Sequence, residues 1–124
     1  MNVKTLLGAA LIASLSIAGS AAAETTLDQI KSSKTIRMGY RDASIPFSFV
    51  GDDKQPRGFT VDLCKIVAAD LAKQLNLEKL DVQWVLVTAQ SRFDALKSGK
   101  IDLECGNSTQ TLTRRAEFDF SVMT

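Results

Sequence analysis

The sequence predicts an α/β fold in which a mainly parallel sheet is flanked by helices. Segments with strand character alternate along the chain with segments whose apolar residues recur at helical spacing, and the connections between them are short. This alternation is typical of parallel strands joined by right-handed crossovers. The composition, 45% hydrophobic and 23% charged, is that of an ordinary globular protein.

The first 23 residues have the pattern of a secretory signal peptide. A basic start at Met1–Lys4 precedes an apolar run over Thr5–Ile17, and three small residues, Ala21–Ala23, supply a cleavage site before Glu24. The apolar run is shorter than the roughly 20 residues that a transmembrane helix needs. We therefore expect a soluble protein exported to a bacterial periplasm, whose mature chain of 101 residues, 24–124, forms one small domain.

The mature chain is expected to begin with a helix and a strand. Thr26–Ser33 has a helical pattern with Thr26 as its N-cap, and Thr35–Tyr40 (TIRMGY) has the pattern of a strand.

A flap is predicted next. Ile45–Val50 is expected to be extended after a turn at Pro46, and residues 51–56 (GDDKQP) form a polar turn. Together with Phe59, these pieces predict a hairpin-like flap.

The rest of the chain alternates between helix and strand. Residues 61–75 form a predicted helix whose apolar side chains recur at helical spacing: Leu63, Ile66, Val67, Leu71 and Leu75. Val82–Val87 (VQWVLV) is a nearly continuous buried strand. Ser91–Lys97 is a short helix that Gly99 ends, and Ile101–Cys105 is a further strand.

The charge and the residue content exclude several classes of function. The chain has 15 Lys and Arg and 14 Asp and Glu, and because Lys4 lies in the leader, the mature part is neutral. A neutral chain lacks the basic stripe that a nucleic-acid-binding protein needs. The absence of histidine argues against His-centred catalysis and against a His metal site. We therefore expect no nucleic-acid partner, no metal ion and no other cofactor.

The two cysteines, Cys64 and Cys105, have two interpretations. An oxidising compartment and an even count favour a disulfide. Such a bridge would close a loop of about 41 residues and stabilise the domain by roughly 4 kcal/mol. The alternative is two buried thiols that act as small hydrophobic side chains.

Polar loops follow three of the predicted strands, and each of them carries or leads to an arginine. Arg41 follows the first strand directly, Arg92 follows the segment Thr88–Ser91, and Arg114 follows the polar stretch 106–113. The carboxyl ends of parallel strands share one edge of a sheet, where ligands bind. Guanidinium groups and free backbone N–H groups suit carboxylates. The sequence therefore predicts an anion site at this edge of the sheet. We expect this site to bind two carboxylates.

Each of these features also has a purely structural interpretation. A single arginine after a strand is often a solvated surface charge, and the stretch that begins at Asn107 can be a loop with self-satisfied side chains. Trp84 fits a core position, whereas Asp102 and Glu104 fit solvent-facing positions of a strand. The sequence contains no nucleophile elbow, glycine-rich phosphate loop or metal-ligand spacing.

Several motifs, taken together, resemble those of a known protein family. They are Gly58–Leu63 (GFTVDL), Thr88–Phe93 (TAQSRF), Gly99–Gly106 (GKIDLECG), and Thr109–Arg114 (TQTLTR) with Asp119–Ser121 (DFS) behind it. In this order they resemble the bacterial periplasmic solute-binding proteins, family 3, of polar amino-acid ABC importers, and within these the glutamate/aspartate-binding branch. The resemblance implies a periplasmic binding protein-like lobe. It makes 24–124 a truncated first-lobe segment, without the second lobe.

The resemblance also implies roles for five residues. Arg114 matches the arginine that clamps the α-carboxylate of the ligand, aided by the hydroxyl and backbone N–H of Thr109. Asn107 would contact the α-amino or carboxylate end of the ligand. Arg41 and Arg92 match the two basic residues that grip a side-chain carboxylate in the acidic-ligand branch.

The positions around these residues fit the same branch, with some departures. Ser44 and Ala89 stand where many relatives with other ligands carry an aromatic ring, and small residues leave space for the guanidinium groups. Thr60 stands where an acidic residue is usual, Asn107 where the branch often has Ser, and Ala89 where it often has a hydroxyl.

The function implied by the resemblance is transport. The intact relative is expected to bind glutamate or aspartate in the periplasm by hinge closure and to present it to the membrane permease of an ABC importer. The alternatives are an enzyme on the same fold, such as a cyclohexadienyl or arogenate dehydratase, and a non-functional fragment. The chain alone is expected to bind weakly or not at all, because the closing motion and the acidic residue that receives the ligand ammonium belong to the second lobe.

Overall fold

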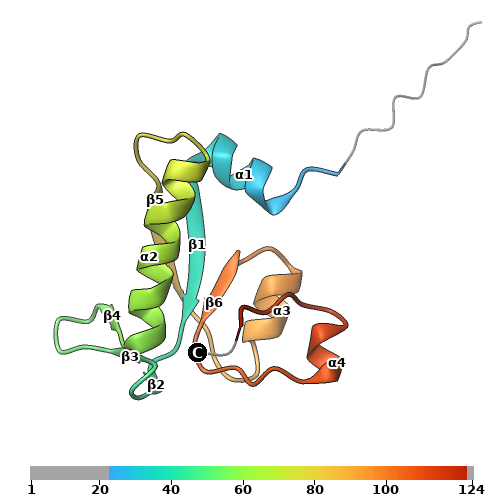
Figure 1. Ribbon diagram of the computed structural model, residues 1–124. Helices are drawn as coiled ribbons and strands as arrows, with labels where there is room; N and C mark the ends of the chain where they lie inside the picture. The colour runs from blue at the N-terminus through green and yellow to red at the C-terminus, as the bar shows by residue number, and fades with distance from the viewer. Residues whose placement is uncertain (1–22, 123–124) are drawn as a thin grey trace, which may run out of the picture.

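The computed structural model describes residues 23–122 and shows a small α/β unit (Figure 1). Its elements are α1 (Thr26–Ser33), β1 (Thr35–Tyr40), β2 (Ala43–Ser44), β3 (Ser48–Val50), β4 (Pro56–Arg57), α2 (Phe59–Gln74), β5 (Asp81–Leu86), α3 (Arg92–Lys97), β6 (Leu103–Cys105) and α4 (Leu112–Arg115). The signal peptide expected over residues 1–23 lies outside the described residues, except for its last position.

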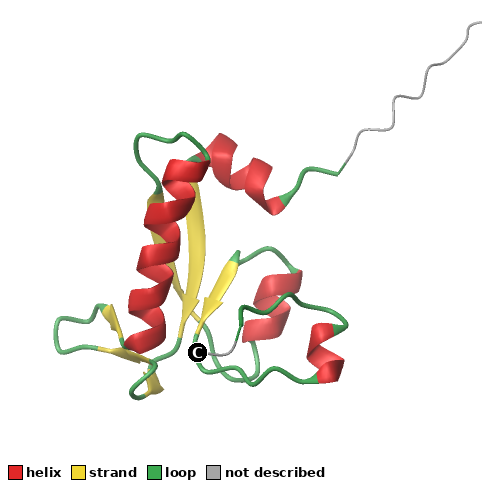
Figure 2. Cartoon of the chain, in the orientation of Figure 1, coloured by secondary structure: helices red, strands yellow, loops and turns green. Residues whose placement is uncertain are grey.

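The predicted parallel sheet is confirmed. β1 is the central strand and pairs in parallel with β5 on one side and with β6 on the other. The three arrows run in the same direction, so their carboxyl ends meet at one end of the molecule (Figure 2). In this register Gly39 of β1 stands opposite Val85 of β5 and Glu104 of β6.

Helices cover both faces of the sheet. On one face, Ile30 of α1 and Ala68 of α2 pack against Ile36 and Met38 of β1 and form a first buried cluster. On the other face, Ala95 of α3 forms a second buried cluster with two residues that flank the strands, Val87 and Ile101. Trp84 is half-buried and packs against the first cluster, in agreement with its expected core position.

Gly39 makes the contact with the second cluster possible. A Cβ atom at this position would lie 2.6 Å from Cδ1 of Ile101 and 3.4 Å from Cγ2 of Val87. A larger residue would therefore push the α3 side of the sheet away from β1.

A disulfide joins Cys64 of α2 to Cys105 of β6, with 6.2 Å between the Cα atoms. Both residues are buried within the first cluster. The bridge therefore attaches the longest helix to the strand that precedes the predicted anion-binding loop. The alternative of two free buried thiols is wrong.

The flap is present, but its strands differ from the expected segment. β2, β3 and β4 form a small antiparallel sheet, which Figure 1 shows beside the start of α2. The extended stretch expected at Ile45–Val50 is interrupted, because the Phe47 N–H donates to the Ser44 carbonyl (2.8 Å) and closes a turn around Pro46. Gly58 fixes the flap to α2. Its φ is +124°, and a Cβ there would lie 2.3 Å from the Phe47 carbonyl oxygen.

Several element ends also differ from the prediction by one or two residues, those of α2, β5 and α3 among them. The N-cap of α1 is Thr25 and not Thr26, because Thr25 and Asp28 form a reciprocal capping box. β6 begins at Leu103 and not at Ile101, because the Ile101 N–H donates to the Ala95 carbonyl of α3 (3.1 Å).

Candidate anion-binding site

Three arginines lie where the strands of the parallel sheet end. Arg41 follows β1 directly, Arg92 is the first residue of α3, and Arg114 lies in α4. The guanidinium carbons of Arg92 and Arg114 lie 4.9 Å and 4.8 Å from the centroid of the same ring, that of Phe93. Segments that are far apart in the sequence thus bring their positive charges to one place.

The charges of the three arginines act on one another. Burial lowers the pKa of Arg92, and the positive charges of Arg41 and Arg114 lower it further, while Glu104 opposes the decrease. Charges affect one another in this way only over short distances, because water and salt screen longer ones. Arg92 and Arg114 therefore lie together against Phe93, and the charge of Arg41 acts on Arg92 as well.

The backbone of Arg41 is held by the flap and the sheet. Its N–H donates to Oγ of Ser48 (2.9 Å), a fully buried residue of β3. The carbonyl of the preceding Tyr40 accepts the Val87 N–H (2.9 Å), which extends the β1–β5 pairing by one step. Nε of Arg41 is buried and has no hydrogen-bond partner.

Arg92 is held by a tight turn. Thr88 and Ser91 exchange hydrogen bonds, each accepting the backbone N–H of the other on its hydroxyl oxygen at 3.0 Å. Nη1 of Arg92 donates to the Ala89 carbonyl (2.8 Å), and its Nε is buried without a partner. Arg92 is 9% exposed, so its charge is fixed inside the site.

The third arginine belongs to a short helix that the sequence did not predict. Thr111 is the N-cap of α4, and its Oγ1 accepts the Arg114 N–H (3.2 Å). Nη1 of Arg114 donates to the Thr109 carbonyl (2.8 Å). Asn107 and Thr109 lie on the preceding loop with exposed side chains, so their expected contacts with a ligand remain predictions.

Glu104 is the site residue that sequence reasoning missed. It was expected to fit a solvent-facing position, but its Oε1 is buried and has no hydrogen-bond partner. Burial raises the pKa of Glu104, and the charges of Arg92, Arg41 and Arg114 oppose this increase.

Strand parity is the signal that identifies Glu104. It alternates with Leu103 and Cys105, which belong to the α2 side of the sheet, so it must face the α3 side. That side carries Arg92 at the start of α3.

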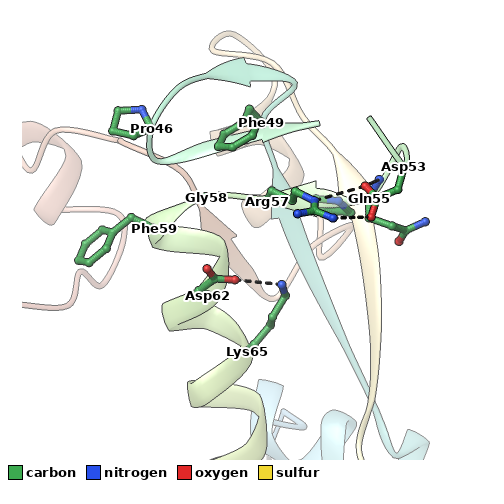
Figure 3. A pocket seen from close by; sticks show the side chains of 10 residues that line it. Pro46, Phe49, Asp53, Gln55, Arg57, Gly58, Phe59, Asp62 and Lys65 are labelled. Carbon is green, nitrogen blue, oxygen red and sulfur yellow. Dashed lines mark hydrogen bonds and ion pairs between the residues drawn. The ribbon is translucent and has the colours of Figure 1, made fainter. Parts of the chain in front are cut away.

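A well-formed hollow in the described part of the chain lies away from the three arginines. It has a volume of about 650 Å³ and lies between the flap and the start of α2 (Figure 3). Its charged residues are already paired with one another, Asp53 with Arg57 at 2.7 Å and Asp62 with Lys65 at 3.0 Å. None of the three site arginines lines it.

Residues 23–122 contain neither a grouped set of metal ligands nor a membrane-spanning helix. Within this range, no three His, Cys, Asp or Glu side chains are grouped so that they could hold a metal ion. None of the helices there combines the length and the apolar character needed to cross a membrane.

Residues 36–124 match the bacterial extracellular solute-binding proteins, family 3. The chain belongs to this family. It is 42% identical over 121 residues to the L-glutamate/L-aspartate-binding protein of Pseudomonas aeruginosa, covering 95% of this chain and 40% of that protein. It is 34% identical over 118 residues to the glutamate/aspartate import solute-binding protein of Escherichia coli, covering 94% of this chain and 39% of that protein.

Solved structures of the family share the fold. The ancestral amino acid-binding protein AncCDT-1, a precursor of cyclohexadienyl dehydratase, superposes with a TM-score of 0.68 at 34% identity, over 78% of this chain and 40% of its own. A mutant of domain 1 from TmArgBP, in its arginine-bound form, superposes with a TM-score of 0.58 at 30% identity, over 73% of this chain and 64% of its own.

These relationships establish the family and the coarse class of the protein. The family is one of solute-binding proteins, and the two curated relatives are by name binding proteins for glutamate and aspartate. The chain spans about 40% of the length of these curated relatives and corresponds to part of their N-terminal lobe.

Proposed function

We propose that this chain supplies the anion-binding side of a site for an acidic amino acid, glutamate or aspartate, which an ABC importer takes up. One observation carries the proposal: three guanidinium groups from separate segments gather with a single carboxylate at the carboxyl end of the sheet. The surplus of positive charge suits a ligand with two carboxylates. The names of the relatives from Pseudomonas aeruginosa and Escherichia coli agree with this ligand.

The proposed roles of the arginines follow from how each is held. Arg92 and Arg41 are the more enclosed pair, and each has a buried Nε that lacks a partner, so both are suited to a carboxylate of the ligand side chain. Arg114 is braced by the Thr109 carbonyl and is suited to the α-carboxylate. Thr109 and Asn107, on the loop before α4, would complete the α-carboxylate end.

We also propose that residues 24–124 act as a first-lobe segment. The predicted signal peptide would direct the export of the protein to the periplasm. A transporter permease is then the protein partner, and we propose no catalytic activity. AncCDT-1 shows that an amino acid-binding protein of this fold can be a precursor of a dehydratase. No acid–base pair accompanies the arginines of the described residues, so binding is the better supported function.

The test is a titration of the purified chain with L-glutamate and L-glutamine, followed by the NMR signals of the arginine side chains. Arg114→Ala should weaken both ligands alike, by roughly fivefold, because both carry an α-carboxylate. Arg92→Ala should weaken glutamate by a similar factor and leave glutamine nearly unchanged.

Arg115→Ala is the matched control, because Arg115 is exposed, lies next to Arg114 and is absent from the cluster. It should leave both affinities unchanged. Equal losses for glutamate and glutamine in Arg92→Ala would exclude the side-chain role of Arg92. Equal effects of Arg114→Ala and Arg115→Ala would exclude the clamp.

A further inference from the structure

Glu104 is the one carboxylate among the three arginines of the anion site. It stands opposite Gly39 in the sheet register, on the strand face that carries no α2 contacts. A Cβ atom added to Gly106 would lie 2.1 Å from Oε1 of Glu104 and 3.3 Å from Cγ of Arg41, so both side chains pass over this glycine. Gly106 therefore leaves the room in which Glu104 and Arg41 approach each other.

Glu104 is near the arginines without being bound to any of them. No ion pair in the described chain joins it to a guanidinium group within 4.0 Å. Its Oε1 and the nearby Ser108 Oγ are both buried and have no hydrogen-bond partner. The Nε atoms of Arg41 and Arg92 also lack a partner, so the carboxylate acts on the arginines through its charge and not through a hydrogen bond.

The charge of the cluster has a simple consequence for ligand choice. Three guanidinium groups carry three positive charges, and ionised Glu104 reduces the total to two. Without Glu104 the site would carry an additional positive charge and would attract compact, multiply charged anions more strongly.

We propose that Glu104 is the internal counter-ion of the anion site and that it discriminates against inorganic dianions in favour of an amino-acid dicarboxylate. The proposal rests on the proposed function for its ligand, but the charge coupling that it requires exists without any ligand. Glu104 is here a specificity-determining residue that acts through the arginines and donates or accepts no bond to the ligand.

The discrimination follows from the different charges of the two ligand classes. Sulfate carries two negative charges on one small group, whereas glutamate carries a net charge of one because its ammonium offsets one carboxylate. Repulsion from a fixed carboxylate is proportional to ligand charge, so removing that carboxylate helps sulfate more than glutamate. Salt screens the effect, so it is greatest at low ionic strength.

The first experiment titrates the purified chain with sodium sulfate and with L-glutamate at low, matched ionic strength, following the arginine side-chain NMR signals. Glu104→Gln should strengthen sulfate binding by roughly fivefold and glutamate binding by no more than about twofold. Glu104→Asp keeps the charge and should bind sulfate as weakly as the unaltered chain does.

Glu78→Gln is the matched control, because Glu78 is exposed and lies between α2 and β5, and its change alters the net charge by the same amount. It should change neither affinity. A gain in sulfate affinity is not a result that misfolding can produce. The proposal is overturned if Glu104→Gln and Glu78→Gln bind sulfate equally, or if Glu104→Gln loses both ligands alike.

A second experiment needs neither a ligand nor a Glu104 variant. The titration of the Glu104 side-chain carboxyl is followed by NMR in the unaltered chain, in Arg114→Gln and in Arg115→Gln. Removing a guanidinium group that faces Glu104 should raise its pKa further, so Arg114→Gln should shift the titration to higher pH and Arg115→Gln should not. Identical titrations in all three proteins would overturn the counter-ion role.

The two experiments separate the two proposals. In one outcome neither sulfate nor glutamate binds, while Arg114→Gln still shifts the Glu104 titration. The proposed function then fails, and so does the discrimination role of Glu104; only the charge coupling between Glu104 and Arg114 stands. If both ligands bind and Glu104 does not respond to the loss of Arg114, the proposed function stands and the counter-ion role fails.

Discussion

Arg37 donates three hydrogen bonds to Asp102. Its backbone N–H and Nε reach Oδ2 at 2.8 Å and 3.1 Å, and its Nη2 reaches Oδ1 at 2.6 Å. The Asp102 side chain is 4% exposed and that of Arg37 is 34% exposed. The interpretation of Asp102 as a solvent-facing residue is therefore wrong. The pair joins β1 to the segment before β6, where the regular strand pairing has not yet begun.

Loss of the Asp102 carboxylate should destabilise the fold. Asp102→Ala leaves the Arg37 guanidinium and a backbone N–H without their acceptor, so we expect the free energy of unfolding to fall by roughly 2–4 kcal/mol. Urea unfolding measures this change. Asp81→Ala is the control, because its ion pair with Lys79 is exposed and should contribute less than about 1 kcal/mol. Equal losses for the two variants would contradict the structural role of Asp102.

Reduction of the disulfide should also destabilise the chain. The Cys64–Cys105 bridge spans 41 residues, and its loss should lower the free energy of unfolding by roughly 4 kcal/mol, because the unfolded chain regains entropy. Urea unfolding with and without a thiol reductant checks this expectation. The Cys64→Ser/Cys105→Ser double variant should resemble the reduced protein and be insensitive to reductant. A reductant effect of the same size in this variant would show that the bridge is not the cause.

Stability should depend on pH through Glu104. Burial raises the pKa of its carboxyl above the ordinary 4.5, so the folded state binds the proton more tightly than the unfolded state does. The stability that this group contributes is therefore complete below the unfolded pKa and is lost as pH rises through the folded pKa.

The comparison with Glu104→Gln isolates this effect. Asp28 and Asp53, whose pKa values are lowered by their hydrogen bonds, act in the opposite direction but are common to both proteins. We expect the free energy of unfolding of the unaltered chain, relative to Glu104→Gln, to fall as the pH rises above the ordinary carboxyl pKa of 4.5. Urea unfolding at a series of pH values measures the difference. A difference that is flat or increases with pH contradicts the raised pKa.

The chain by itself should bind glutamate more weakly than micromolar. Asn107 and Thr109 are exposed, and charge pairs open to water are worth only about 0–1 kcal/mol each. A micromolar dissociation constant requires roughly −8 kcal/mol. Calorimetric titration of the oxidised and of the reduced chain checks this prediction. Domain 1 from TmArgBP has a solved arginine-bound form, and micromolar affinity of the present chain is the outcome that would contradict the prediction.

The sequence alone determined the order and type of most elements. Three features could be read from the sequence: the apolar spacing of α2, the continuous apolar run of β5 and the Cys64–Cys105 pair. Each depends on a local residue pattern or on the compartment of the protein, which the sequence itself indicates. The strand order then followed from the alternation of strands and helices, because parallel strands need crossovers. That order was sufficient to predict that Arg41, Arg92 and Arg114 share one edge.

Only the tertiary structure decided what the carboxylates do. Asp102 and Glu104 occupy alternate positions in a strand-like segment, and the sequence gives both the appearance of solvated charges. The Asp102 side chain is buried beside Arg37 of the neighbouring strand, and Oε1 of Glu104 is buried on the side of the sheet that α3 covers. A charge can be buried only where partners from distant segments supply favourable interactions that offset its desolvation. The local sequence does not identify these partners.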